Sequence, residues 1–201
     1  PEIAVAATKS YSAQLLLSYL LVMQWAGKTP ATADLSTRAS ELYNHSCDIA
    51  EVAKTLDLGS EIVILGRGFA YPNAKEAALK IQETCKINVQ GMSTADYLHG
   101  PISALNSNSQ VIIMAPYMLP QKSVQEAVDR IRTVTKKIYW VGSGAEPQQG
   151  EKVILGAMCP DEITSSIADS MALQLLALHL SVLNGFNPDA PEGLSKVTLT
   201  I

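Results

Sequence analysis

Two hydrophobic periodicities alternate along the chain. Short apolar runs rich in β-branched residues predict buried strands, and longer segments with apolar positions three and four residues apart predict helices. The expected strands are 61–65, 110–115 and 137–142, with a short extended piece at 88–91 and a short edge strand at 153–155. The expected helices are 8–26, 33–56 with a break near its middle, 73–86, 124–136 and 161–183, with a single turn at 95–99. Strands that alternate with helices indicate a parallel sheet covered by helices.

The first helix contains a very apolar segment, Leu15–Trp25. This segment is too short to cross a bilayer, which takes about 20 residues. We therefore expect a core or interface helix and no membrane partner. Because the chain begins at Pro1 and opens on a helix with no strand before it, we also expect a domain cut from a longer protein.

Helix 73–86 carries a line of charged side chains. Pro72 suits a helix start, where its missing N–H costs nothing. Glu76, Lys80 and Glu83 are four and three residues apart, so they fall on one stripe of the helix surface. Such a stripe is most often a solvated row of ordinary ion pairs. The alternative is a site that moves protons, as chemistry on an open-chain sugar would require.

Two further residues could join such a site. His99 stands in a turn before Gly100-Pro101, where a histidine is usually structural or exposed but can also exchange a proton near neutral pH. Lys196 lies in the last eight residues, LSKVTLTI, and is a candidate second amine.

A glycine turn, Gly66-Arg67-Gly68, follows the expected strand 61–65 and precedes helix 73–86. Strand, glycine turn and helix N-terminus can cradle an anionic group with backbone N–H groups. The full dinucleotide fingerprint is not present, because no third glycine follows at the required position. Two glycines after a strand most often make only a tight turn.

Composition narrows the classes of function. The chain has 201 residues and a net charge of −4, so it can form one domain with a substantial core and gives no indication of nucleic-acid binding. Its three cysteines have no metal-ligand spacing and are expected to be reduced, buried thiols. With no signal-peptide pattern, a cytoplasmic protein without a metal is expected.

Four segments of the chain form a recognisable set: AVAATKSY at Ala4–Tyr11, ILGRGFAYPNAKEAALKIQE at Ile64–Glu83, LHGP at Leu98–Pro101 and NPDAPEGLSKVT at Asn187–Thr198. Taken together and in this order, they resemble the sugar isomerase (SIS) family in its two-domain form. The family includes glucosamine-6-phosphate deaminases without a glutaminase domain and the isomerase half of glucosamine-6-phosphate synthase.

The resemblance implies an α/β fold, a three-layer αβα sandwich with a mostly parallel, flavodoxin-like sheet. Residues 1–30 would include the last helix of a preceding sugar isomerase domain. Residues 31–184 would form a second such domain, and 185–201 a C-terminal catalytic tail.

The resemblance also assigns catalytic roles. The family's glutamate, which shuttles a proton between C1 and C2 of the sugar, falls on Glu83, and the lysine one turn earlier falls on Lys80. The histidine of the HGP loop, assigned to ring opening, falls on His99. In this family that loop reaches into the neighbouring subunit, which implies a homodimer with shared active sites. The tail lysine near the sugar carbonyl falls on Lys196.

Substrate-binding positions follow from the same comparison. Family contacts near a VASTK motif fall on Val5 and Ala7, and Ser195 precedes the tail lysine. The turn residues Gly66, Arg67 and Gly68 are further candidates for contacts with the substrate.

The chain departs from the family pattern in two respects. The phosphate-binding loop of the first sugar isomerase domain, of the kind S-x-S-G-x-T, is not found in these residues. The VASTK serine is Ala7 here, and the common GELKHGP is ADYLHGP. Both sequence changes look more like the deaminases and the uncharacterised isomerases of the family than the synthase.

The expected function is conversion of glucosamine 6-phosphate to fructose 6-phosphate and ammonia, with a phosphorylated amino sugar as substrate and no cofactor. One alternative is the isomerase half of a glutamine-dependent synthase, or an isomerase or deglycase of another phosphosugar. An alternative of another class is a sensor domain that binds a sugar phosphate without catalysis.

Overall fold

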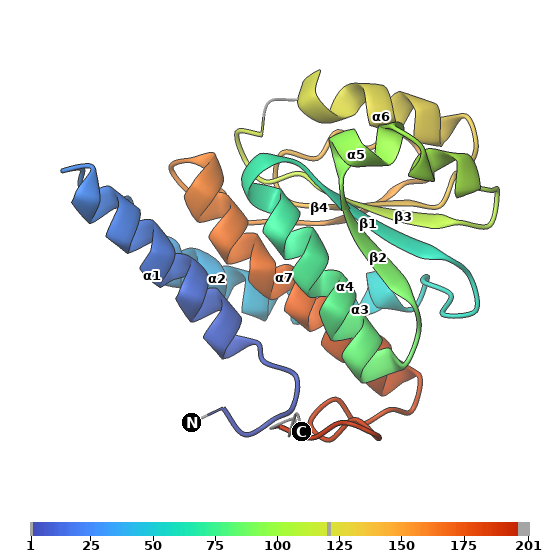
Figure 1. The fold of residues 1–201 in the computed structure, drawn as a ribbon, viewed down its shortest axis with the longest axis horizontal. Coiled ribbons are helices and arrows are strands. Elements are labelled where there is room, and N and C mark those ends of the chain that lie inside the picture. Colours follow the sequence, from blue (N-terminus) through green and yellow to red (C-terminus); the bar gives the residue numbers. More distant parts are fainter. Residues whose placement is uncertain (1, 120–121, 197–201) are drawn as a thin grey trace.

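The computed structural model describes residues 2–119 and 122–196 and shows a central sheet with helices on both faces (Figure 1). Within these residues five strands lie in the order β2-β1-β3-β4-β5, and every neighbouring pair is parallel. The strands are β1 Ile62–Gly66, β2 Val89–Ser93, β3 Gln110–Met114, β4 Ile138–Val141 and β5 Lys152–Ile154. The α/β fold with a parallel sheet is therefore confirmed, and both short extended pieces form edge strands.

The helices agree with the predicted periodicity to within a few residues. They are α1 Lys9–Trp25, α2 Leu35–Asn44, α3 Ser46–Ala53, α4 Tyr71–Cys85, α5 Thr94–Leu98, α6 Lys122–Arg132 and α7 Glu162–Leu183. Short 3₁₀ turns occupy Gly68–Ala70 and Pro101–Ala104. The predicted break in helix 33–56 falls at His45, which ends α2 and precedes α3.

Alternate residues of each strand serve the two faces of the sheet. Ile62 and Ile64 of β1 belong to a core formed with α3, α4 and α7. Val63 and Leu65 belong to a second core with α5 and α6. Because both faces are covered, the strands are apolar without alternation, and the domain is a three-layer αβα sandwich.

Helix α1, predicted to be a core or interface helix, buries one side chain in the domain and leaves much of its apolar surface exposed. Leu17, Leu21 and Trp25 expose 64, 69 and 89% of their surface, whereas Tyr19 is buried. The helix is apolar on all sides and packs only one side on the domain, mainly on α7. Its predicted interface role stays a prediction.

The predicted burial of the cysteines is also wrong at one position. Cys85 and Cys159 are buried free thiols, but Cys47 is exposed. Cys47 lies in the first turn of α3, where Ile49 and Ala53 are the residues that face the core. Its side chain therefore points away from the packed side of the helix.

Helix α7 is the main core helix of the domain. Among the described residues it is the one helix long and apolar enough to cross a membrane, but 67% of its most apolar window is buried inside the protein. It contacts α1, α2, α3 and α4. Its composition therefore reflects burial within the fold.

Asp169 is a fully buried acid on α7. Its Oδ1 atom accepts a hydrogen bond from the Ala157 amide at 2.7 Å, and its Oδ2 atom has no hydrogen-bond partner among the described residues. Burial raises the pKa of Asp169 to about 7, against the smaller opposing effect of the Ala157 amide. A neutral carboxylic acid suits this environment better than a carboxylate.

We expect the free energy of unfolding to fall as the pH rises from about 4 to about 7. In this window the Asp169 carboxyl is ionised in the unfolded chain but keeps its proton in the folded protein. The free energy of unfolding therefore falls by up to about 1.4 kcal/mol per pH unit. Asp169→Asn should remove this slope in urea unfolding measured across the window. The exposed substitution Asp129→Asn should leave the slope in place, and an unchanged slope in Asp169→Asn would contradict the assignment.

Candidate active site

Helix α4 packs so closely against strand β2 that only small residues fit between them. A Cβ atom at Gly91 would lie 2.4 Å from the backbone oxygen of Ala74, which excludes any larger residue there. Ala74, Ala77 and Ile81 face the core from α4, at 0, 1 and 0% exposure. This packing fixes the rotation of α4 and turns its charged stripe toward the N-terminal segment and α1.

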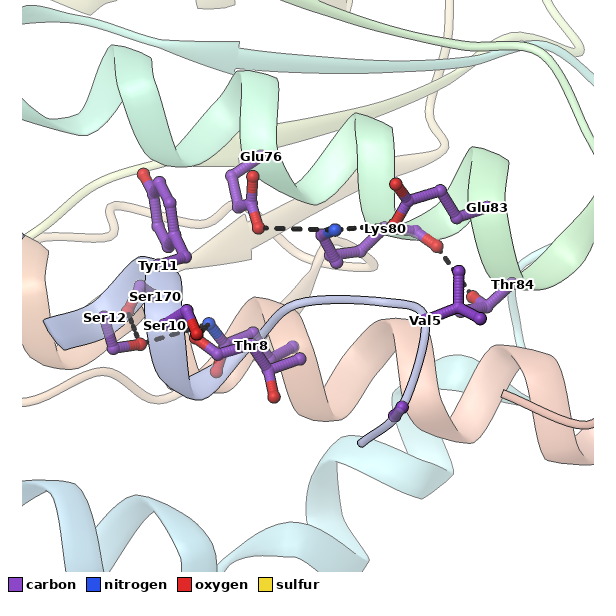
Figure 2. A network of polar contacts seen from close by, with 12 residues as sticks. Val5, Thr8, Ser10, Tyr11, Ser12, Glu76, Lys80, Glu83, Thr84 and Ser170 are labelled. Carbon is purple, nitrogen blue, oxygen red and sulfur yellow. Dashed lines mark hydrogen bonds and ion pairs between the residues drawn. The ribbon is translucent and has the colours of Figure 1, made fainter. Parts of the chain in front are cut away.

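The stripe is a buried cation between two carboxylates (Figure 2). The Lys80 ammonium lies 2.6 Å from Glu83 Oε2 and 3.6 Å from Glu76 Oε1. Its side chain is only 5% exposed, while those of Glu76 and Glu83 are 14 and 23% exposed. A solvated row of ion pairs would be far more exposed, so this alternative from the sequence does not describe the stripe.

Several effects, not all in the same direction, act on the pKa of Glu76. Burial raises the pKa of Glu76, the nearby Lys80 ammonium lowers it, and the Glu83 carboxylate raises it again. The site therefore holds one fixed cation and two carboxylates in a place with little water. Two carboxylates beside one fixed cation can divide proton transfer and charge stabilisation between them.

Tyr11 of α1 stands opposite Glu76 and was not predicted from the sequence. Its hydroxyl donates a hydrogen bond of 2.7 Å to Asn73 Oδ1 on α4. Burial, and secondarily the charge of Glu76, raises the pKa of Tyr11. Sixty-two positions separate Tyr11 from Asn73, and no local pattern links two such distant residues.

The N-terminal segment and the C-terminal tail meet beside this stripe. The Val5 amide donates to the backbone oxygen of Asp189 at 3.5 Å. Lys196 Nζ donates to the Ala4 oxygen at 2.7 Å and approaches the Val5 oxygen at 3.5 Å. The two ends of the described chain thus bring predicted residues Val5 and Lys196 together. Ala7 is half-buried on the same segment, and Ser195 is exposed beside Lys196.

A cavity of about 260 Å³ lies between these elements. It is lined by Ala4, Ala6 and Thr8 of the N-terminal segment, Lys80 and Thr84 of α4, a face of α7, and Pro188 with Asp189 of the tail. A wider groove of about 870 Å³ runs along the other side of the stripe, where Tyr11, Glu76 and Asp96 contribute to its walls. Lys80 therefore borders the cavity on one side of the stripe, and Glu76 borders the groove on the other.

His99 stands apart from this cluster. It is exposed and follows the last residue of α5. Within the described residues no hydrogen bond or ion pair joins the His99 side chain to Glu83, Lys80 or Lys196. A role of His99 in the site of its own chain has no support from these contacts.

The predicted anion cradle lies at the opposite end of α4. Gly66-Arg67-Gly68 precedes the first turn of this 15-residue helix, whereas Glu83 lies in its last turn, so about 20 Å separates them. Arg67 is exposed, and Gly68 has a φ of 55°. Gly68 borders a separate, mainly apolar cavity of about 280 Å³ with Tyr19 and Phe69. The turn and the charged stripe therefore do not form one site.

Comparison with known proteins finds relatives in sequence and in fold. No protein-family model matches the chain. The chain is 33% identical to the glutamine–fructose-6-phosphate aminotransferase (isomerizing) of Methanothermobacter thermautotrophicus, over 98% of this chain and 34% of that protein. It is 30% identical to the enzyme of the same name from Pyrococcus horikoshii, again over 98 and 34%. The chain thus spans about a third of the length of these curated relatives.

Solved structures show the same fold. The C-terminal domain of glucosamine-fructose-6-phosphate aminotransferase from Francisella tularensis has a TM-score of 0.81 at 18% identity, over 94% of this chain and 57% of that one. The glucosamine-6-phosphate deaminase of Thermotoga maritima has a TM-score of 0.75 at 22% identity, over 98 and 58%. The predicted resemblance to the sugar isomerase family is confirmed, and the sequence relatives are aminotransferases.

Removing the buried cation should destabilise the protein. Lys80→Met leaves the Glu76 and Glu83 carboxylates buried without a partner, which costs about 3 kcal/mol at pH 7.5. Part of this loss should return at lower pH, because Glu76, whose pKa is already raised, then takes up a proton. Urea unfolding at pH 5 and 7.5 measures both effects.

Lys75→Met is the matched control, since Lys75 lies on the same helix but is exposed over the ring of Tyr71. It should change the unfolding free energy by less than about 1 kcal/mol. Equal losses for both substitutions would show that Lys80 is not the buried cation of this site.

Proposed function

We propose that this chain is the isomerase part of a phosphosugar enzyme and moves a proton between C1 and C2 of an open-chain hexose 6-phosphate. The observation that carries the proposal is Lys80, which is buried between Glu76 and Glu83 beside a cavity lined by the N-terminal segment. The aminotransferase relatives, whose names include an isomerising activity, support the same class of reaction.

The reaction needs one base that serves two adjacent carbons. The Glu83 carboxylate takes the proton from C1 of the ketose, which leaves an enediolate, and returns it to C2. The hydroxyl proton of O1 passes to O2, and the product is the aldose. Lys80, 2.6 Å away, holds Glu83 in place and offsets the negative charge that develops on the sugar oxygens. Lys196 supplies a second cation from the tail.

Between the two activities of the family, the comparisons favour the aminotransferase. The sequence relatives at 33 and 30% identity are glutamine–fructose-6-phosphate aminotransferases, which the sequence analysis held as the alternative to a deaminase. Ala7 in place of the family's serine and ADYLHGP in place of GELKHGP remain the observations in favour of the deaminase. Both activities need the same C1–C2 proton transfer, so they share the proposed site.

The decisive experiment follows the proton and does not depend on the nitrogen source. The protein is incubated in D₂O with fructose 6-phosphate or glucosamine 6-phosphate, and NMR measures deuterium incorporation at C1 and C2. Glu83→Gln should lower the exchange rate by about 10²- to 10⁴-fold, because the amide cannot act as a base. Binding of the sugar phosphate, measured by calorimetry, should change little.

Glu76→Gln is the matched variant, since it alters the other carboxylate of the same stripe. If Glu76→Gln stops exchange and Glu83→Gln does not, Glu76 is the base and the assignment is wrong. Absence of exchange in the wild-type protein, despite binding, favours a sensor. Ammonia release from glucosamine 6-phosphate without glutamine would identify a deaminase.

The position of His99 suggests sites shared between two copies of the chain. If His99 opens the sugar ring in the partner's site, then Glu83→Gln and His99→Asn proteins, each inactive on ring-closed substrate, should complement one another. Random mixing of subunits would restore about a quarter of the wild-type activity, because half the dimers then contain one intact site. No recovery in mixed dimers verified by mass spectrometry would place both residues in one chain's site or exclude His99 from catalysis.

A further inference from the structure

Glu2 carries a largely buried carboxylate at the start of helix α1. Its Oε1 atom accepts hydrogen bonds from the amides of Thr8 at 2.9 Å and Ser10 at 3.4 Å. The side chain is 12% exposed. Glu2 thereby satisfies backbone donors that a helix N-terminus leaves without partners, although it lies six residues before the cap residue Thr8.

The second oxygen of this carboxylate has a different neighbour. Glu2 Oε2 is buried and accepts no hydrogen bond within the described part of the chain. The Lys196 ammonium lies 3.9 Å away, close enough to balance its charge. The Ser10 hydroxyl, then the amides of Thr8 and Ser10 and lastly Lys196 lower the pKa of Glu2 to about 2, against the opposing effect of burial. The group is therefore an anion at neutral pH.

Within the described residues two ion pairs hold the tail. Their lysines are similarly exposed, Lys196 at 38% and Lys86 at 42%, but Glu2 is far more buried than Glu192. Lys86, the residue after α4, pairs with Glu192, but their side chains are 42 and 85% exposed. Exposed pairs of this kind contribute little, because water and salt screen them. The Glu2 carboxylate is shielded from water and fixed by the α1 amides, so it can set the position of the amine that approaches it.

We propose that Glu2 is the positioning residue for Lys196, which it holds beside Ala4 and Val5 at the segment lining the Lys80 cavity. The inference rests on the proposed function only for its catalytic consequence. Glu2 does not touch the site itself; it acts through Lys196, which donates to the Ala4 oxygen at 2.7 Å. Ala4 in turn lines the cavity that contains Lys80.

The variant that isolates this role is Glu2→Gln. Glutamine retains the Oε1 acceptor for Thr8 and Ser10, so the start of α1 is preserved, but it removes the charge that faces Lys196. Amine acetylation of the whole protein, read by mass spectrometry, reports how freely Lys196 reaches solvent. We expect the rate at Lys196 to rise about fivefold. The rate at Lys152, an exposed residue of β5, should stay the same.

Glu192→Gln is the control for the exposed contact and should change the Lys196 rate by less than about twofold. Thermal unfolding of Glu2→Gln checks that the helix start is intact. An unchanged Lys196 rate in a Glu2→Gln protein of normal stability would overturn the proposal and leave Glu2 as a helix cap only. A larger effect from Glu192→Gln would transfer the positioning role to the Lys86 pair.

The catalytic consequence is tested by a double-mutant cycle on the exchange rate. Glu2→Gln should lower kcat about tenfold with KM nearly unchanged, and should have almost no further effect in a Lys196→Met background. Additive losses would show that Glu2 acts through the fold and overturn its role in positioning. An inactive wild-type protein would contradict the proposed function alone, since acetylation tests the position of Lys196 independently.

Discussion

The site depends on the close packing of helix α4 against the sheet. Small residues on both sides, Ala74 on the helix and Gly91 on β2, let the two backbones approach to a distance at which no larger side chain fits. This contact leaves α4 one rotation about its axis. Because the side of α4 with small and apolar residues packs into the core, the charged stripe must face the N-terminal segment. The chemistry of the site follows from that orientation.

Burial changes what the stripe can do. On an exposed helix, Glu76, Lys80 and Glu83 would be solvated and their interactions weak. Covered by α1 and the N-terminal segment, Lys80 becomes a fixed cation, and Glu76 is held where burial raises its pKa. The same cover brings the tail into place, because the N-terminal segment also receives Lys196. One short segment thus encloses the carboxylates and orients the second amine.

The comparisons and the geometry complement each other. The relatives are aminotransferases of which this chain spans about a third, and the solved structures establish the fold. Among the described residues, no hydrogen bond or ion pair joins the His99 side chain to the stripe, and the Gly66–Gly68 turn lies at the other end of α4. The contacts within one chain therefore support the stripe and the tail as one cluster.

The sequence alone determined where strands and helices follow one another along the chain and which charged residues share one stripe of α4. Both follow from local periodicity. It also indicated the family, because four segments together resemble the sugar isomerase family. It could not show that Lys80 is buried, that Tyr11 reaches α4, or that Glu2 faces Lys196, since these depend on residues far apart in the chain. Nor could it show that α1 leaves Leu17 and Trp25 exposed. Only the tertiary structure decides which side of a helix is covered, because burial is a property of the neighbours that packing provides.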